Sequence, residues 1–241
     1  METAAYAHGA WQAALVTIVF TAAAWLLNGV TRSGALAGAL VSFAIYLSAG
    51  PGAFLALVSV FVIAVGTTRI GYTRKQALGM AEGLEGRSAS QIVANVGIAA
   101  VASLLSGLSR DPAFLIAGAA ALTEAAADTA ASEIGQATSG QARLITTFER
   151  VPVGTNGGIT ISGTLAGAVA SLLVAACCVL VKMISESAFL LVTGAGFAGM
   201  LLDSVLGALV ERPRALNNDA VNLLGTFSAA LIALLVSRAR H

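Results

Sequence analysis

Several acidic side chains of this chain fall inside stretches that are otherwise strongly apolar. Glu124, Asp128 and Glu133 follow an alanine-rich run, and Asp203 and Glu211 belong to the run MLLDSVLGALVE. Glu124 and Asp128 are four residues apart, so a helix places them on one face. A charge at membrane depth costs at least about 2.5–3.5 kcal/mol, and it usually has a functional partner. The acids therefore favour metal or phosphate chemistry, with Mg²⁺ as the hard cation that prefers oxygen ligands; a structural ion pair, such as Asp128 with an arginine, is the alternative.

A glycine-rich turn, Gly154-Thr155-Asn156-Gly157-Gly158, leads into the next apolar run. Glycines let backbone N–H groups point into one concavity, and a helix that begins near Ile159 adds its positive end. Both features favour phosphate, although ordinary tight turns use glycine as well. The turn is not a Walker motif, because the chain contains no Gly-Lys-Ser or Gly-Lys-Thr.

Basic side chains lie near the acids and the glycine-rich turn in the sequence. Arg143 and Arg150 lie between the acids and the turn, and the polar segment 69–90 contributes Arg69, Arg74, Lys75 and Arg87. They would neutralise a pyrophosphate, or they are the ordinary positive charge of a cytoplasmic loop.

The last apolar run opens with Asn217-Asn218-Asp219-Ala-Val-Asn222. A helix cap explains part of this polarity. Asn218, Asp219 and Asn222 together exceed what a cap needs, so we expect them to face the same cavity as the acids.

The composition is that of a polytopic membrane protein, with residues 1–241 as one integral-membrane domain. The chain is 57% hydrophobic and 10% charged, with a mean hydropathy of +0.87, whereas soluble domains are about 25% charged. With no basic run and 6% aromatic residues, a nucleic-acid partner is not expected. Zinc is not expected either, because the two histidines are terminal and the two cysteines are adjacent within an apolar run.

Eight apolar stretches predict an all-α bundle of about eight spans. They are 10–30, 34–49, 52–68, 91–108, 112–134, 159–182, 187–210 and 220–236. The second is short and is predicted to be tilted or re-entrant. The main polar loops are 69–90, 135–158 and 211–219.

The distribution of Lys and Arg predicts an outside N-terminus in a cell (plasma or inner) membrane. Nine basic residues then lie on the cytoplasmic side and four on the other: Arg32, Arg69, Arg74, Lys75, Arg87, Arg143, Arg150, Arg212 and Arg214 against Arg110, Lys182, Arg238 and Arg240. This orientation brings the three polar loops, and the candidate site, to the cytoplasmic face.

Two segments of the chain resemble each other. SGALAGALVS at 33–42 and SGTLAGAVAS at 162–171 agree at seven of ten positions. A duplication explains this, and so does the small alphabet of close helix packing. In either case, Gly34, Gly38, Gly163 and Gly167 are predicted to lie at close helix contacts.

The order of these motifs resembles an integral-membrane family that includes the plant phytyl-phosphate kinase. The resemblance rests on ADTAASEIG, RLITTFERVPVGTNGGITISGTLAG, LLDSVLGALVE and NNDAVN, and it covers the chain from Thr31 to its end. The pattern is also similar to dolichol kinase and phytol kinase, which carry a lysine where this chain has Thr155-Asn156-Gly157-Gly158.

The resemblance implies a Mg²⁺-dependent kinase that transfers a phosphoryl group from a nucleoside triphosphate, such as CTP, to phytyl or geranylgeranyl monophosphate. Catalysis would then be positioning and charge neutralisation. The implied residues are, for metal, Asp128, Glu133, Asp203 and Glu211; for phosphate and nucleotide, Gly154, Thr155, Asn156, Gly157, Gly158, Arg74, Asn218, Asp219 and Asn222; and for charge neutralisation, Lys75, Arg143 and Arg150. A transporter or flippase of a phosphorylated lipid is the alternative.

Overall fold

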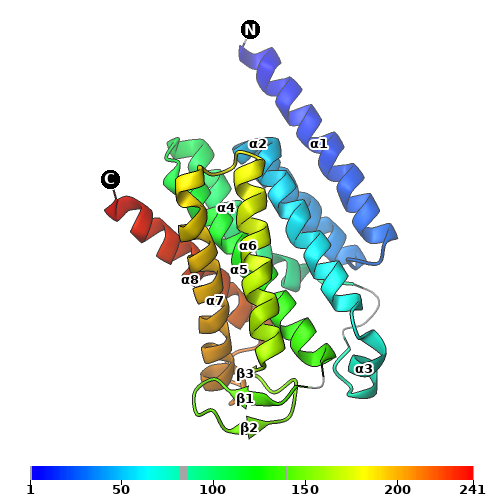
Figure 1. Ribbon diagram of the computed structural model, residues 1–241. Helices are drawn as coiled ribbons and strands as arrows, with labels where there is room; N and C mark the ends of the chain where they lie inside the picture. Colours follow the sequence, from blue (N-terminus) through cyan, green and yellow to red (C-terminus); the bar gives the residue numbers. More distant parts are fainter. Residues whose placement is uncertain (1, 82–85, 139, 241) are drawn as a thin grey trace.

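The computed structural model describes residues 2–81, 86–138 and 140–240, and most of them lie in helices (Figure 1). Seven helices in this part of the chain are long and apolar enough to cross a membrane. They are α1 (Glu2–Leu26), α2 (Arg32–Arg69), α4 (Ala89–Ser109), α5 (Ala113–Ala137), α6 (Ile161–Leu180), α7 (Phe189–Leu206) and α8 (Asn218–Ala239). A short 3₁₀ turn, Glu186–Ala188, precedes α7, and a π-helical turn, Gly207–Glu211, extends it. The protein is therefore a polytopic helical membrane bundle, as the composition predicted.

α2 consists of two halves that run in opposite directions (Figure 1). Gly50 has non-helical backbone angles (φ 81°, ψ −177°), and Pro51 follows it. Arg69 at the end of α2 donates to the Leu27 carbonyl, 3.0 Å away, just before α2 begins. Both ends of α2 thus lie together, and the bend separates the stretches 34–49 and 52–68 that the sequence marked as two spans. The first half is a regular helix up to Gly50, and whether it is tilted or re-entrant in the membrane stays a prediction. The number of membrane crossings and the outside N-terminus stay predictions.

The polar elements gather at one end of the bundle, here called the sheet end. It carries α3 (Tyr72–Ala77) and a three-stranded antiparallel sheet of β1 (Ala142–Leu144), β2 (Arg150–Val151) and β3 (Gly158–Ile159), in the order β2-β1-β3. The nine basic residues assigned to the cytoplasm all belong to elements at this end. The stretch 135–158 was predicted as a loop, but its strands pair because a backbone folded against protein needs internal hydrogen-bond partners. Residues 82–85 of the loop 69–90, and His241, lie outside the described residues.

α5 is the central helix, and alanine and glycine let its neighbours approach closely. Most of its side chains are buried, including Ala119, Ala120, Ala121 and Leu122 at 0% exposure. Added Cβ atoms at Gly163 and Gly167 of α6 would touch the carbonyls of Ala131 and Ala127, respectively. Small residues at such crossings allow the close van der Waals packing on which membrane helices depend.

Three of the four glycines in the similar segments lie at close contacts, and the prediction for Gly38 is wrong. A Cβ at Gly34 would collide with the carbonyl of Arg87, and Gly163 and Gly167 lie against α5. A Cβ at Gly38 would meet nothing within 4 Å, because Gly38 lines an apolar cleft between helices. The match between the two segments therefore extends to packing at Gly34 and Gly163 but not at Gly38 and Gly167.

Gly34→Ala should lower the thermal unfolding midpoint of the detergent-solubilised protein by several degrees. The added methyl group meets backbone, and overpacking of this kind costs about 1–3 kcal/mol. Gly38→Ala is the matched control, and it should leave the midpoint unchanged or raise it slightly, since alanine favours a helix. Equal losses in the two variants would contradict this account of the packing.

Candidate functional site

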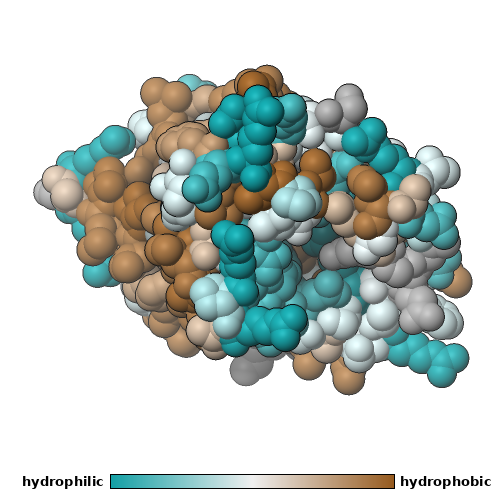
Figure 2. All heavy atoms as spheres, turned by 90° about the horizontal axis from the view of Figure 1, so that it is seen from below, coloured by the Kyte–Doolittle hydropathy of each residue, from teal (hydrophilic) through white to brown (hydrophobic). Residues whose placement is uncertain are grey.

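A polar cavity of about 340 Å³ opens at the sheet end of the bundle. Figure 2 views the molecule from this end and shows hydrophilic side chains around a hollow, flanked by apolar surface. Side chains from α4, α5, α7 and α8 line the cavity, together with the glycine-rich turn and the start of α6. Segments far apart in the sequence therefore build one site.

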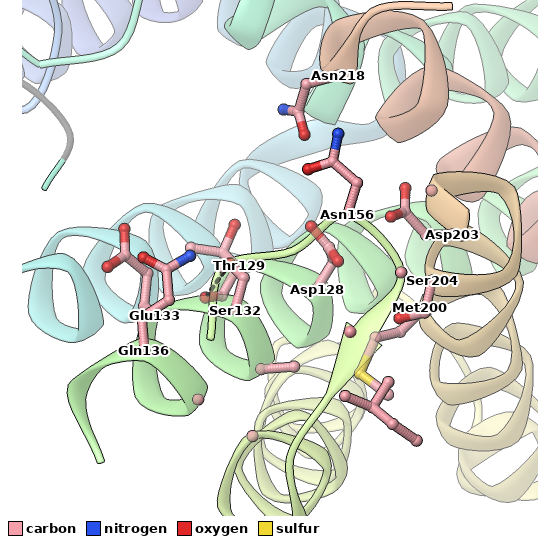
Figure 3. A pocket seen from close by; sticks show the side chains of 18 of the residues that line it. Asp128, Thr129, Ser132, Glu133, Gln136, Asn156, Met200, Asp203, Ser204 and Asn218 are labelled. Atoms are coloured by element: carbon pink, nitrogen blue, oxygen red, sulfur yellow. Dashed lines mark hydrogen bonds between the residues drawn. The ribbon is translucent and has the colours of Figure 1, made fainter. Parts of the chain in front are cut away.

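Carboxylates of α5 and α7 enter this cavity near the ends of their helices. Asp128 of α5 and Asp203 of α7 line it together with Asn156 and Asn218 (Figure 3). Glu211, in the π-helical turn, lines it as well, and the three acids interact electrostatically. Asp128, Gly157 and Asp203, which the sequence expected to converge, lie in one cavity.

Glu124 extends the acidic cluster one turn deeper along α5. Its side chain is 1% exposed, and its Oε1 atom has no hydrogen-bond partner; the same holds for Oδ2 of Asp203, which is 8% exposed. Both oxygens lie beside Gly225 of α8, where a Cβ would collide with Glu124. Unpartnered buried carboxylate oxygens are costly, so this arrangement favours a bound cation or a proton.

Three helix N-termini face the same cavity. Arg87 and Gln91 line it at the start of α4, Thr160 and Gly163 at the start of α6, and Asn218 at the start of α8. The positive ends of helix dipoles and their first N–H groups favour anions. The cavity therefore combines helix starts that favour anions with acids of α5 and α7 that would attract a cation.

The glycine-rich turn lies in the cavity wall, and its glycines have a packing role. Gly157 has φ +76°, and a Cβ there would collide with the backbone of Ala208. Two N–H groups of the turn already bond internally, Thr155 to the Pro152 carbonyl at 3.2 Å and Gly158 to the Thr155 carbonyl at 2.8 Å. A phosphate would thus meet the remaining groups of the turn, which include the Asn156 side chain.

Lys75 and Glu133 form a buried ion pair that ties α3 to α5. Glu133 also accepts from Thr68 Oγ1 at 2.9 Å, and Lys75 donates to the Thr68 carbonyl at 2.6 Å. Lys75 is 1% exposed and does not line the cavity. This pair fixes the end of α2. Glu133, which the sequence predicted as a metal ligand, also lines the cavity, whereas Lys75 has a structural role instead of the predicted charge neutralisation.

Several of the other basic residues singled out from the sequence lie outside the cavity. Arg143 and Arg150 are exposed cross-strand neighbours on β1 and β2, and Arg143 donates to the Phe148 carbonyl at 2.8 Å. Ala142, which alternates with Arg143 along β1, is the residue that faces the cavity. Arg74 does not line the cavity either, and neither does the acid Asp219, which the sequence expected there.

Arg87 is the cation that the structure brings to the cavity instead. Its guanidinium donates to Thr129 Oγ1 of α5 at 3.3 Å, and it interacts electrostatically with Asp128. The sequence offered Arg87 only as one member of a basic segment. Its position directly before Ser88, which caps α4, is the signal that would have distinguished it.

Further polar residues line the cavity without having been expected there. Ser132 and Gln136 follow Asp128 at four-residue spacing, so the helical face of that acid predicts them. The others are Gln91, Thr129, Thr160, Thr164 and Ser204. These residues come from separate elements: Gln91 from the start of α4, Thr160 and Thr164 from the start of α6, and Ser204 from α7. Asn218 adds the start of α8, and only the fold brings them all together.

The donor set fits Mg²⁺ held jointly with a phosphate. Among the described residues, no group of three or more His, Cys, Asp or Glu side chains could hold a metal ion by itself. Mg²⁺ commonly takes one or two carboxylates and completes its shell with water and substrate phosphates. Asp128 and Asp203, with the unpartnered Oδ2 of Asp203, supply such a partial shell.

Comparisons with known proteins give the chain a family. Residues 15–230 match the family described as integral membrane protein DUF92, so the chain belongs to that family. The resemblance drawn from the motifs is thereby confirmed. No solved structure matches the chain.

Relatives come from an archaeon, a plant and a cyanobacterium. The chain is 35% identical over 209 residues to an uncharacterized membrane protein of Methanocaldococcus jannaschii, covering 85% of this chain and 84% of that one. It is 30% identical over 223 residues to the chloroplastic protein VTE6 of Arabidopsis thaliana, covering 88% and 67%. It is 34% identical over 195 residues to an uncharacterized membrane protein of Synechocystis, covering 79% and 76%.

Lys75→Met should destabilise the protein by about 3–5 kcal/mol, because Glu133 would be left buried without its partner. Chemical unfolding in mixed micelles measures this change. Adding Glu133→Gln to Lys75→Met should restore much of the loss, since no unpaired charge then remains. Full stability of the single variant would show that the pair does not hold α3 against α5.

Proposed function

We propose that this protein is a prenyl-phosphate kinase that transfers a phosphoryl group from a nucleoside triphosphate to a prenyl monophosphate. One observation carries the proposal: acids at the ends of α5 and α7 face the starts of α4, α6 and α8 across one polar cavity. A metal–phosphate ligand requires this combination of cation-binding and anion-binding groups. Placing the site on the cytoplasmic side, where nucleoside triphosphates are found, follows from the predicted orientation.

Asp128 and Asp203 would hold Mg²⁺, with Glu211 beside them. The ion would neutralise charge on the phosphates of the donor. Arg87 and the helix starts would bind the phosphate groups, and Asn156, Asn218 and Asn222 would orient them through hydrogen bonds. Arg87 would take the role that the sequence assigned to Lys75, Arg143 and Arg150.

The transfer itself needs no strong base. The bond between the terminal phosphorus and the bridging oxygen of the donor breaks, and a bond forms to a phosphate oxygen of the acceptor. That oxygen is already ionised at neutral pH, so no proton has to be removed. Positioning and electrostatic stabilisation are then sufficient for catalysis.

The choice of a prenyl monophosphate as acceptor rests on the family. The motifs resemble a family that includes the plant phytyl-phosphate kinase, and VTE6 of Arabidopsis is a relative over most of this chain. A membrane-embedded site suits an acceptor with a hydrocarbon chain and a phosphate head.

A transporter of phosphorylated lipids is less well supported. Such a protein needs a polar route through the bundle. Beyond Glu124, α5 continues toward the opposite end with Ala117, Ala119, Ala120 and Ala121, each at most 3% exposed and packed in the core. This packing favours an enzyme whose site is reached from the sheet end.

The direct test supplies the purified protein with Mg²⁺, each nucleoside triphosphate in turn, and phytyl or geranylgeranyl monophosphate. The proposal expects the prenyl diphosphate, detected by mass spectrometry, with at least one donor. If no pair gives product while vesicles containing the protein move the lipid phosphate across the bilayer, the kinase assignment is wrong.

Asp203→Asn should lower the rate of phosphoryl transfer at least about 100-fold, the usual scale for loss of one preorganised charge-stabilising group. High Mg²⁺ should recover part of that rate. The control is Asp219→Asn, an acid at the start of α8 that does not line the cavity; its rate should stay within a few-fold of the original. Equal losses of rate in the two variants would show that Asp203 is not a metal ligand.

Arg87→Gln should reduce the rate by at least about tenfold, because a phosphate loses a charge-assisted hydrogen bond. Arg143→Gln, at the exposed face of the sheet, should have little effect in the same assay. If the rate falls more in Arg143→Gln than in Arg87→Gln, the phosphate is bound by the arginines that the sequence singled out and not by Arg87.

A further inference from the structure

An apolar cleft lies between α1, both halves of α2 and the start of α4. Its volume is about 70 Å³, and its walls are almost wholly hydrocarbon and glycine, with Phe20, Leu57 and Phe61 among them. α1 runs obliquely to the other helices, and its N-terminal part projects beyond them (Figure 1); it packs chiefly on α2. The cleft is therefore a recess within the apolar part of the molecule.

This cleft shares two wall residues, Arg87 and Asn95, with the polar cavity. The backbone of Arg87 belongs to the cleft side, where its N–H donates to the Gly29 carbonyl at 3.1 Å and its carbonyl accepts from Thr31 N–H at 3.0 Å. Its guanidinium reaches the other side and donates to Thr129 of α5. One arginine thus stands between a polar cavity and a hydrocarbon-lined one.

We propose that the cleft binds the hydrocarbon chain of the prenyl monophosphate, at the isoprene units next to the phosphate. With the phosphate bound by the guanidinium of Arg87 in the polar cavity, the chain would pass Arg87 and Asn95, the two residues that the cavity and the cleft share, to enter the cleft. The cleft is small, so the rest of the chain extends into the bilayer. This assignment rests on the proposed function, and it adds the surface that recognises the lipid part of the acceptor.

Gly38 gives a way to fill the cleft without disturbing a helix contact. It lines the cleft, and a Cβ there would meet nothing within 4 Å. Gly66 is the matched control, because it lies in the other half of α2, and a Cβ there also meets nothing within 4 Å. Gly66 does not line the cleft.

The experiment compares Gly38→Phe and Gly66→Phe with geranylgeranyl monophosphate and with methyl monophosphate, a short acceptor that has no isoprene unit. Gly38→Phe should raise KM for the long acceptor at least tenfold relative to the short one, while Gly66→Phe leaves both unchanged. If the wild type turns over the acceptor but Gly38→Phe does not change the ratio of the two KM values, the cleft does not bind the hydrocarbon chain. The proposed kinase function would not be affected by that result.

A second measurement separates the cleft from the reaction. Geranylgeranyl monophosphate with a photoreactive diazirine in its first isoprene unit should label peptides of α1, α2 or α4 in the wild type. Gly38→Phe should abolish that labelling. Labelling of this kind without any turnover would overturn the kinase function and support the cleft, and labelling confined to α6 or α7 would overturn the cleft. Because it can be read in the wild type, this result decides the matter even if Gly38→Phe does not fold.

Discussion

Acidic side chains inside an apolar bundle impose the constraint on which the rest of this structure depends. Asp128, Asp203 and Glu124 repel one another, and each would be costly to bury without compensation. Arg87 interacts electrostatically with Asp128, and the positive starts of α4, α6 and α8 line the same cavity as Asp128 and Asp203. Because the helices alternate in direction, the ends of α5 and α7 necessarily meet these starts. The meeting of acidic helix ends with positive helix starts thus follows from the order of the helices along the chain.

Close packing makes this convergence possible. α5 lies at the centre, and the glycines of α6, α7 and α8 bring backbones to it without intervening side chains. Gly225 is the clearest case, because its missing Cβ leaves room for both Glu124 and Asp203. Gly157 similarly lets the glycine-rich turn rest on Ala208. Small residues in this protein therefore serve the site as well as the stability of the bundle.

The sequence predicted the architecture and the principal acids, since long apolar runs and buried carboxylates leave strong local signals. The lengths of the apolar stretches identified the helices, the stretches 34–49 and 52–68 matched the two halves of α2, and Asp128 and Asp203 lie in one cavity. It did not predict which basic residues face that cavity. Arg143 and Arg150 were chosen for their place between two motifs, but strand alternation turns them outward. Lys75 forms an ion pair with Glu133, which is 58 residues away in the sequence. No local sequence pattern reveals such a pairing.

The central claim is that one cavity holds a divalent cation together with a phosphate. Mn²⁺ in place of Mg²⁺ makes this directly measurable by electron paramagnetic resonance on the purified protein with a nucleoside triphosphate. The account predicts one bound Mn²⁺ per chain, with hyperfine coupling to phosphorus, and loss of that signal in Asp128→Asn and Asp203→Asn but not in Asp219→Asn. Failure to bind Mn²⁺, or binding that survives removal of both cavity acids, would contradict it.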